Sequence, residues 1–117
     1  MIEELISRVF ATRNAAHIAH WSETSGFRHE VLGDFYSSII KKTDKLVEAH
    51  MGAYGLISDV KISDPKSDNI AKHIAEEAAW IDQNRDKIAG KARAISNLID
   101  DLVDLYLTTH YKLTKLS

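Results

Sequence analysis

Three histidines near the start of the chain have the residue type and spacing of metal ligands. His17 and His20 are three residues apart and, at 100° per residue, share the apolar face of one helical segment. His29 follows a short connection. Imidazole is the commonest neutral metal ligand, and one helical turn lets two rings face the same site. The competing interpretation is a set of hydrogen-bonded core histidines, since a buried polar group without a partner is costly.

Two carboxylates further along the chain extend this candidate ligand set. Asp44 and Glu48 are one helical turn apart, at the border of an apolar arc. Carboxylates together with imidazoles suit iron, manganese or zinc. The competing interpretation is an ordinary solvated helix edge, on which Lys41, Lys42 and Lys45 balance the two acids.

The length of a helix separates the histidines from the carboxylates. His29 and Asp44 are 15 residues apart on one predicted helix, which places them about 22 Å apart along its axis. One chain therefore cannot bring His20, His29, Asp44 and Glu48 to a single ion. An antiparallel two-fold partner would supply its carboxylates to these histidines, and such a dimer would hold two equivalent sites.

Apolar residues recur at three- and four-residue steps almost throughout the chain, which is the helical period. Short connections between long helices favour antiparallel neighbours. We therefore expect an all-α fold, an antiparallel four-helix bundle in a single domain of residues 1–117. The predicted helices cover about residues 2–23, 28–54, 65–87 and 91–115.

Glycine and proline mark the expected helix ends. Gly52 and Gly55 lie where the second helix should end, and Gly90 marks a break before the fourth. Asp64 followed by Pro65 has the pattern of an N-cap and a first helical residue, which predicts the start of the third helix.

Composition argues against several classes of function. The chain has 117 residues, a formal net charge of −2 and no cysteine, which disfavours a nucleic-acid surface, thiolate metal sites and disulfides. Its first residues carry acids early and lack the apolar run of a signal peptide. No stretch approaches the length of a membrane span. We therefore expect a cytoplasmic protein that has neither membrane nor nucleic acid as a partner.

A motif pattern in the first half of the chain resembles that of the Dps family of mini-ferritins. The pattern is a His-Trp pair, a His-Glu pair, and acids 15 and 19 residues after the second histidine, here His20-Trp21, His29-Glu30, Asp44 and Glu48. The resemblance implies a ferritin-like fold. It also implies that iron is bound, and oxidised by a ferroxidase reaction, at sites shared across a two-fold interface.

The same resemblance implies a role for each matched residue. His20 and His29 would be ligands from one subunit, Asp44 and Glu48 ligands from its mate, and Trp21 would lie beside the metal. His17 is a further candidate ligand because of its position one turn before His20. The metal would be iron, or another divalent ion such as manganese or zinc.

A wider resemblance links most of the chain to short, uncharacterised, ferritin-like proteins encoded by tailed bacteriophages. It rests on four segments, residues 16–21, 29–36, 48–55 and 97–113. It implies a location in the host cytoplasm. Compared with Dps proteins, the first connection is shorter, the crossover has shrunk to about eleven residues, and a lysine-rich tail is absent. We therefore expect a homodimer or higher homo-oligomer, without DNA binding of the Dps kind.

The remaining polar residues support weaker expectations. We expect His73 at the surface, His50 and His110 in structural roles, and Asp101 as an acceptor for the N–H of a metal-ligating histidine. The alternative function is a metal-free ferritin-like module that binds a host or virion protein. A hydrolase is disfavoured, because no pair of nucleophile and base stands out.

Overall fold

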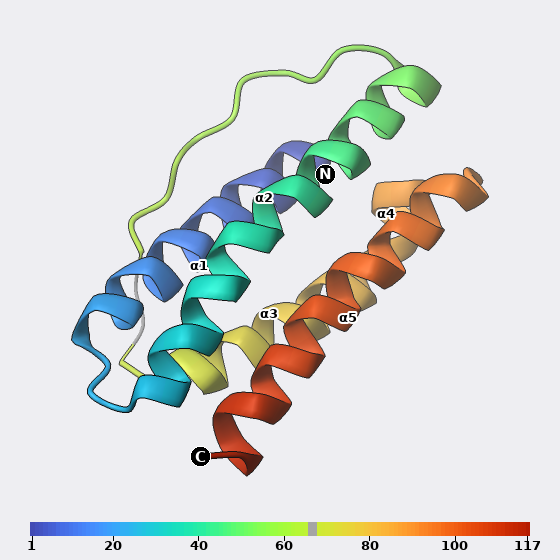
Figure 1. The fold of residues 1–117 in the computed structure, drawn as a ribbon. Helices are drawn as coiled ribbons and strands as arrows, with labels where there is room; N and C mark the ends of the chain where they lie inside the picture. The colour runs from blue at the N-terminus through green and yellow to red at the C-terminus, as the bar shows by residue number, and fades with distance from the viewer. Residues whose placement is uncertain (66–67) are drawn as a thin grey trace.

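The computed structural model describes residues 1–65 and 68–117, and most of these residues are helical (Figure 1). No strand occurs in the described residues, so the expected all-α class is confirmed. Within the same residues, no helix combines the length and apolar character needed to cross a bilayer. The helices are α1 (Ile2–Ser22), α2 (Gly26–Tyr54), α3 (Ile70–Gln83), α4 (Arg85–Ala89) and α5 (Arg93–Lys115).

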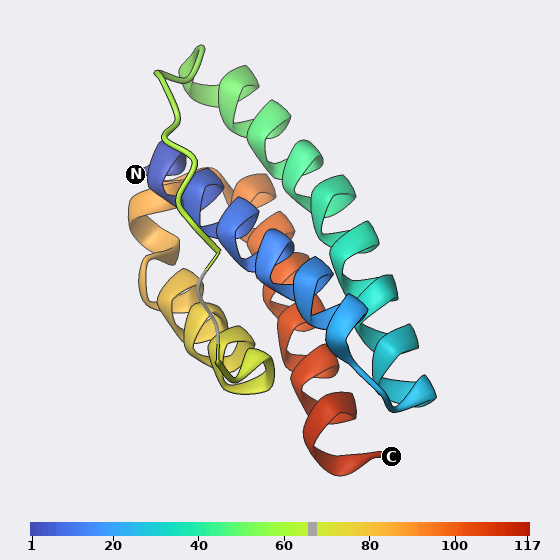
Figure 2. The ribbon, with the colours of Figure 1, turned by 90° about the vertical axis from the view of Figure 1, so that its left-hand side faces the viewer.

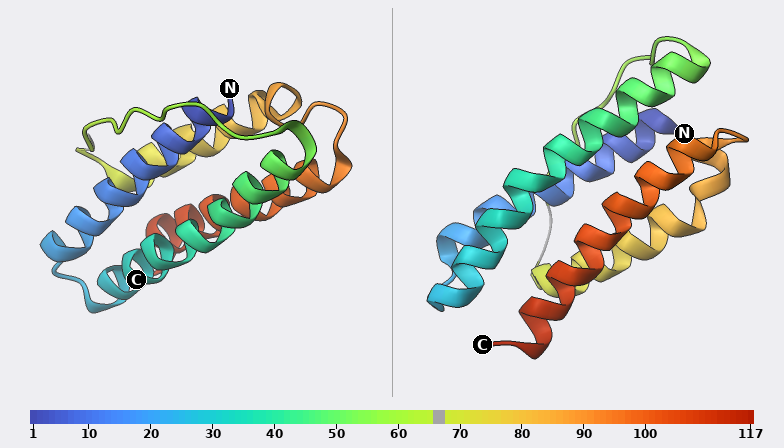
Figure 3. Two further views of the ribbon diagram at one scale, coloured as in Figure 1. Left: turned by 90° about the horizontal axis from the view of Figure 1, so that it is seen from above. Right: turned by 45° about the vertical axis from the view of Figure 1, so that its right-hand side comes forward.

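The four longer helices lie side by side, and each helix contacts two of the others. Helix α1 packs against α2 and α3, and α5 packs against the same two helices. Helices α1 and α5 run in one direction while α2 and α3 run in the other, so that contacting helices are antiparallel (Figures 1 and 3). The molecule is elongated along these helices, with extents of 43 × 25 × 21 Å.

Local chemistry explains where α2 begins and ends. The Ser25 hydroxyl accepts a hydrogen bond from the Arg28 N–H, as an N-cap does. Gly55 follows the last turn at a φ of +94°, a backbone conformation that glycine adopts without a steric penalty. The expected end of this helix is confirmed, and α2 runs without interruption past His29, Asp44 and Glu48.

The third predicted helix, over residues 65–87, differs from the structure at both ends. Helix α3 starts at Ile70 after an Asn69 cap, whose side chain accepts from the Lys72 N–H, so the predicted cap at Asp64-Pro65 is wrong. Residues 66–67 of the predicted helix lie outside the described residues. Residues 61–65, 68 and 69 are exposed and Ile70 is buried, so the helix begins where burial begins.

The other end of the predicted helix is divided in two. Asn84 interrupts it, donating its side-chain amide to the Trp80 carbonyl, and the short α4 follows. Gly90 then ends α4 at a φ of +58°, which confirms the expected break.

The connection from α2 to α3 travels back along the length of the molecule beside α1 (Figure 2). The Ser58 N–H donates to Glu3, and the hydroxyls of Ser7 and Ser63 are 3.0 Å apart. Ile57 and Val60 pack against the core from this connection. Its path leaves the outer face formed by α1 and α2 uncovered (Figure 2).

The core lies along the common axis of the four longer helices. Phe35 of α2 and Tyr106 of α5 meet edge to face at its centre, with ring centroids 5.3 Å apart. The largest fully buried side chains around them come from every helix: Leu5, Leu32, Ile39, Leu46, Ile74, Ile81, Ile88, Ile95, Ile99 and Leu102. This core fixes α1 against α2 and so positions the predicted histidines.

Candidate functional site

His20 of α1 and His29 of α2 form a stacked pair where the two helices meet. Their ring centroids are 3.6 Å apart and the ring planes are inclined by 20°. His20 Nδ1 lies 2.6 Å from the carbonyl oxygen of His29, and His29 Nδ1 lies 2.7 Å from the carbonyl oxygen of His20. The sequence could predict that these residues are near each other, but not this reciprocal arrangement.

The two hydrogen bonds determine which ring nitrogens are available to a ligand. A carbonyl oxygen only accepts hydrogen bonds, so Nδ1 of both rings must donate. In a neutral imidazole this leaves Nε2 unprotonated, which is the form that binds a metal ion. Metal-ligating histidines commonly donate their other N–H to such an acceptor. The pair therefore has the tautomer expected of metal ligands, and two hydrogen bonds hold its rings in place.

The short connection between α1 and α2 is held by a carboxylate and a guanidinium. Glu23 accepts hydrogen bonds from the Ser25 N–H, at 3.1 Å, and from Arg28 Nε, at 3.0 Å. The Ser25 N–H, followed by Arg28, holds the pKa of Glu23 below its ordinary value. Arg28 also donates to the carbonyl of Leu113 in α5. These contacts tie the histidine end of the molecule to α5.

Gly33 provides the space that the His20 ring occupies. A Cβ atom at position 33 would lie 3.1 Å from Cε1 and 3.3 Å from Nδ1 of His20, closer than ordinary van der Waals contact. The glycine lies inside α2, where alanine would be the more favourable helix former. The sequence does not reveal the role of Gly33, because a glycine within a helix does not show which side chain crosses it.

His17 lies next to this pair but has different surroundings. Its ring stacks on Tyr36 at a centroid distance of 3.9 Å, and it lies 4.4 Å from the ring of Trp21. Desolvation, followed by the nearby charges of Arg13 and His20, lowers the pKa of His17. His17 therefore favours its neutral form, and it forms an aromatic wall beside the pair. The adjacent Trp21 is 70% exposed.

Asp44 and Glu48 lie on the exposed surface of α2, far from the histidines of the same chain. The uninterrupted helix keeps Asp44 about 22 Å from His29 along its axis. No three histidine or acidic side chains in residues 1–65 and 68–117 come close enough together to hold a metal ion. One chain thus presents the two predicted halves of the site at separate places.

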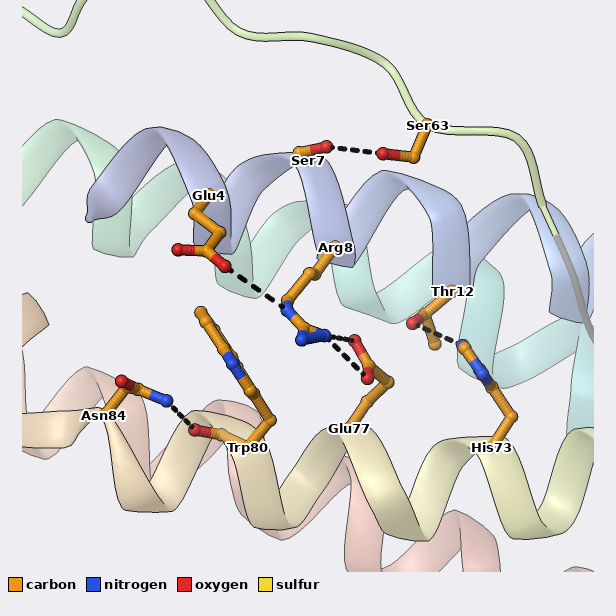
Figure 4. A network of polar contacts seen from close by, with 9 residues as sticks. All are labelled: Glu4, Ser7, Arg8, Thr12, Ser63, His73, Glu77, Trp80 and Asn84. Atoms are coloured by element: carbon orange, nitrogen blue, oxygen red, sulfur yellow. Dashed lines mark hydrogen bonds and ion pairs between the residues drawn. The ribbon is translucent and has the colours of Figure 1, made fainter.

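A second group of polar contacts joins α1 to α3 (Figure 4). Arg8 donates to both carboxylate oxygens of Glu77, at 3.2 and 3.4 Å, and its guanidinium lies 4.2 Å from the centroid of the Trp80 ring. Thr12 Oγ1 and His73 Nε2 are 3.0 Å apart. The expectation that His73 is a surface residue is therefore wrong, because its ring is half-buried against the buried Thr12.

Tyr106 lies at the centre of the molecule, where its hydroxyl group is buried. The side chain is fully buried, and its hydroxyl has no hydrogen-bond partner among the described residues. Burial, reinforced by the charge of Glu77, raises the pKa of Tyr106 well above its ordinary value. Tyr106 therefore stays protonated, and it packs as an aromatic core residue.

The remaining sequence expectations have mixed outcomes. The predicted role of Asp101 as a hydrogen-bond acceptor is wrong, because backbone carbonyls accept from Nδ1 of both His20 and His29. Asp101 instead lies beside lysines of α2. His110 is structural as expected, with Nδ1 2.8 Å from the Ala71 carbonyl.

Comparison with known proteins places the chain in one sequence family. Residues 20–113 match a family of unknown function, DUF5856, and the chain belongs to that family. The matched region includes all four residues His20, His29, Asp44 and Glu48. No curated protein and no solved structure matches the chain.

Proposed function

We propose that this member of the DUF5856 family is a Dps-like protein that binds iron at a site shared between two copies of the chain. The observation that supports the proposal most directly is the reciprocal hydrogen bonding of His20 and His29, which prepares both Nε2 atoms for a metal ion. Iron is the substrate in this proposal, and oxidation would move one electron from each Fe(II) to an external oxidant.

The arrangement of the helices supports a ferritin-like, antiparallel four-helix bundle. Ferritin-like bundles differ from simple up-and-down bundles by having one long crossover connection. In this chain α2 and α3 run in the same direction, and the connection between them returns along the molecule (Figures 1 and 2). Helix α4 is then a short insertion between α3 and α5.

The exposed carboxylates of α2 support a second copy as the source of the missing ligands. Asp44 and Glu48 are both exposed, and none of the ion pairs among the described residues involves them. A carboxylate pair on one subunit and an imidazole pair on the other would give an O₂N₂ ligand set, which suits Fe(II), Mn(II) or Zn(II). A two-fold axis would generate this set twice.

The outer face of α1 and α2 has the character expected of a dimer interface. Half-buried apolar side chains of α1 and α2 pack beside the core, and exposed Trp21 lies near the end of α1. Aromatic residues of this kind are enriched where proteins associate. The apolar residues are Phe10, Tyr36, Ile40 and Val47.

Complementation between two inactive variants tests the shared site. One variant carries His20→Ala and His29→Ala, and the other carries Asp44→Ala and Glu48→Ala. Neither homodimer should bind iron. A heterodimer isolated with two different tags should bind about half as much iron as the wild type. It contains one intact site, in which one variant supplies both histidines and the other supplies both carboxylates. Metal analysis, Fe(II) oxidation and the mass of the assembly are measured on the same preparation.

The rival function predicts a different set of results. A metal-free module that binds another protein would use exposed apolar residues such as Ile18 and Trp21, which are 49% and 70% exposed. In that case wild-type protein would bind no iron, manganese or zinc. A heterodimer that binds no more metal than either parent homodimer would exclude the shared site. Stoichiometric iron binding by a monomer would show that a second copy of the chain is not needed for the site.

A further inference from the structure

A cationic groove lies between α2 and α5, on the other side of α2 from the interface with α1. We call it the lysine groove. It is a cavity of about 310 Å³, lined by Ser38, Lys41, Lys42 and Lys45 of α2 and by Leu98 and Asp101 of α5. Ligand pockets commonly span about 300–1,000 Å³, so this cavity has room for one small molecule.

The lining of the lysine groove carries more positive than negative charge. Three ammonium groups and one carboxylate give the lining a net charge of +2, opposite in sign to the −2 of the whole chain. None of the ion pairs among the described residues involves the three lysines. The neighbouring acid Asp100 pairs with Arg85 at 2.6 Å. The three ammonium groups are therefore free to contact an anion from solution.

Two of the three lysines repel each other along α2. Lys41 and Lys45 are one turn apart, a spacing at which like charges destabilise a helix. Lysines favour the last turn of a helix because of its dipole, but these lysines lie in the middle of α2, which spans Gly26–Tyr54. Asp44 and Glu48, three residues after Lys41 and Lys45, offset part of this repulsion, and a bound anion would offset more of it.

We propose that the lysine groove binds a phosphate monoester of a small, hydroxyl-bearing molecule. A phosphate monoester carries a charge of about −1.5 to −2 at pH 7, which complements the +2 of the lining. Lysine binds phosphate as a point charge. The phosphate occupies the lysine side of the groove, where Lys41, Lys42 and Lys45 neutralise it.

The rest of the lining selects an organic ligand over inorganic phosphate. Leu98 offers an apolar surface for a ring or a carbon chain. Asp101 accepts hydrogen bonds only, so it favours a hydroxyl or amine and disfavours a second anion. The Ser38 hydroxyl both donates and accepts. A monoester therefore binds more tightly than inorganic phosphate, and the corresponding unphosphorylated molecule binds more weakly than either.

Titration of the full-length protein tests this proposal. The protein is first treated with a chelator, so that phosphate bound through a metal ion does not contribute to the signal. The probes are AMP, ribose 5-phosphate, inorganic phosphate and adenosine. Binding of each probe is measured by amide NMR shifts and by calorimetry. We expect both monoesters to shift the amides of residues 38–45 and 98–101, with AMP binding more tightly than inorganic phosphate and adenosine not binding.

Two triple variants with the same change of charge separate the groove from general electrostatic attraction. Lys41→Gln, Lys42→Gln and Lys45→Gln should weaken AMP binding by about tenfold or more, because three phosphate contacts are lost together. The control combines Lys61→Gln, Lys72→Gln and Lys115→Gln, which change three exposed lysines outside the groove. It should leave the affinity for AMP within about twofold of the wild-type value.

Three outcomes would overturn the proposal. Equal weakening in both triple variants would mean that the chain attracts phosphate only through its overall charge. The absence of binding by both monoesters would remove the site, and equal affinity for AMP and inorganic phosphate would remove its organic specificity. The proposed iron site has no part in these measurements, so it stands or falls separately.

Discussion

Helix α1 makes polar contacts with α3 on one side and with α2 on the other. The two sides differ in whether polar atoms remain available to bind a ligand. Towards α3, Arg8 binds Glu77 through both carboxylate oxygens and stacks over Trp80, while Thr12 meets His73. The two charged groups of that interface, Arg8 and Glu77, are thus paired within the chain (Figure 4). Towards α2, each ring of the histidine pair uses only Nδ1.

The difference separates a structural role from a binding role. A polar interface whose groups satisfy each other within the chain contributes to stability, because any lost partner leaves a desolvated group behind. An interface that fixes two rings and leaves a lone pair on each is prepared for a ligand. The α1/α3 contacts should therefore control unfolding, and the α1/α2 contacts should control metal binding.

Arg8→Ala should give the largest effect on stability. The substitution leaves the Glu77 carboxylate, which is only 13% exposed, without its ion-pair partner, and it removes the stacking over Trp80. We expect the free energy of unfolding to fall by about 2–3 kcal/mol. Urea denaturation measures the change, and iron binding by the folded fraction should be unchanged.

Arg13→Ala is the matched control on the other side of α1. It removes the same side chain, whose guanidinium lies 5.3 Å from the Tyr36 ring centroid and has no carboxylate partner among the described residues. We expect a loss of about 0.5 kcal/mol. Equal losses from Arg8→Ala and Arg13→Ala would contradict the distinction between the two interfaces.

Gly33→Ala should have a smaller effect, directed at the α1/α2 interface. Alanine inside a helix normally stabilises by about 0.5–1 kcal/mol relative to glycine. Here the added methyl group would lie 3.1 Å from Cε1 of His20, so the ring must shift by a few tenths of an ångström from its present position against His29. We expect no gain in stability and about tenfold weaker iron binding, as for the loss of a positioning contact.

Gly52→Ala is the control for the same substitution in the same helix. A Cβ atom at position 52 would meet no heavy atom within 4 Å. This variant should gain about 0.5 kcal/mol and bind iron like the wild type. If both glycine variants were stabilised and bound iron equally, Gly33 would not position His20.

The sequence was sufficient for the helices and for the nearness of the histidines. Helical periodicity predicted the all-α class, and the ends of α1, α2 and α5 lie within one or two residues of expectation. His20 and His29 flank a short connection, and any antiparallel pair of helices brings such residues together. Local pattern and chain connectivity determine both results.

Contacts between distant segments could not be predicted in the same way. The Asp64-Pro65 pattern indicated a helix start, but burial of Ile70 and the Asn69 cap determined the actual one. His73 was expected at the surface because nothing local reveals that Thr12, 61 residues earlier, faces it. The reciprocal hydrogen bonds of the histidine pair likewise depend on how α1 packs against α2, which helical periodicity alone does not determine.

The smallest expected effect concerns the dependence of stability on pH at His17. Desolvation, followed by Arg13 and His20, lowers the pKa of His17 below its ordinary value of 6.5. Below about pH 6.5 the unfolded chain therefore takes up this proton more readily than the folded chain, so folding is destabilised as the pH falls. The contribution of His17 to stability is fully present above that pH.

His17→Phe keeps a ring stacked on Tyr36 but removes the titrating group. Thermal unfolding in the presence of a chelator, at about pH 7.5 and about pH 5.5, should show a smaller loss of stability in the variant than in the wild type. Some loss should remain, because burial also lowers the pKa of His50. Identical losses in the two proteins would mean that the surroundings of His17 do not favour its neutral form. Packing against Tyr36 and Trp21 would then not explain the protonation state of His17.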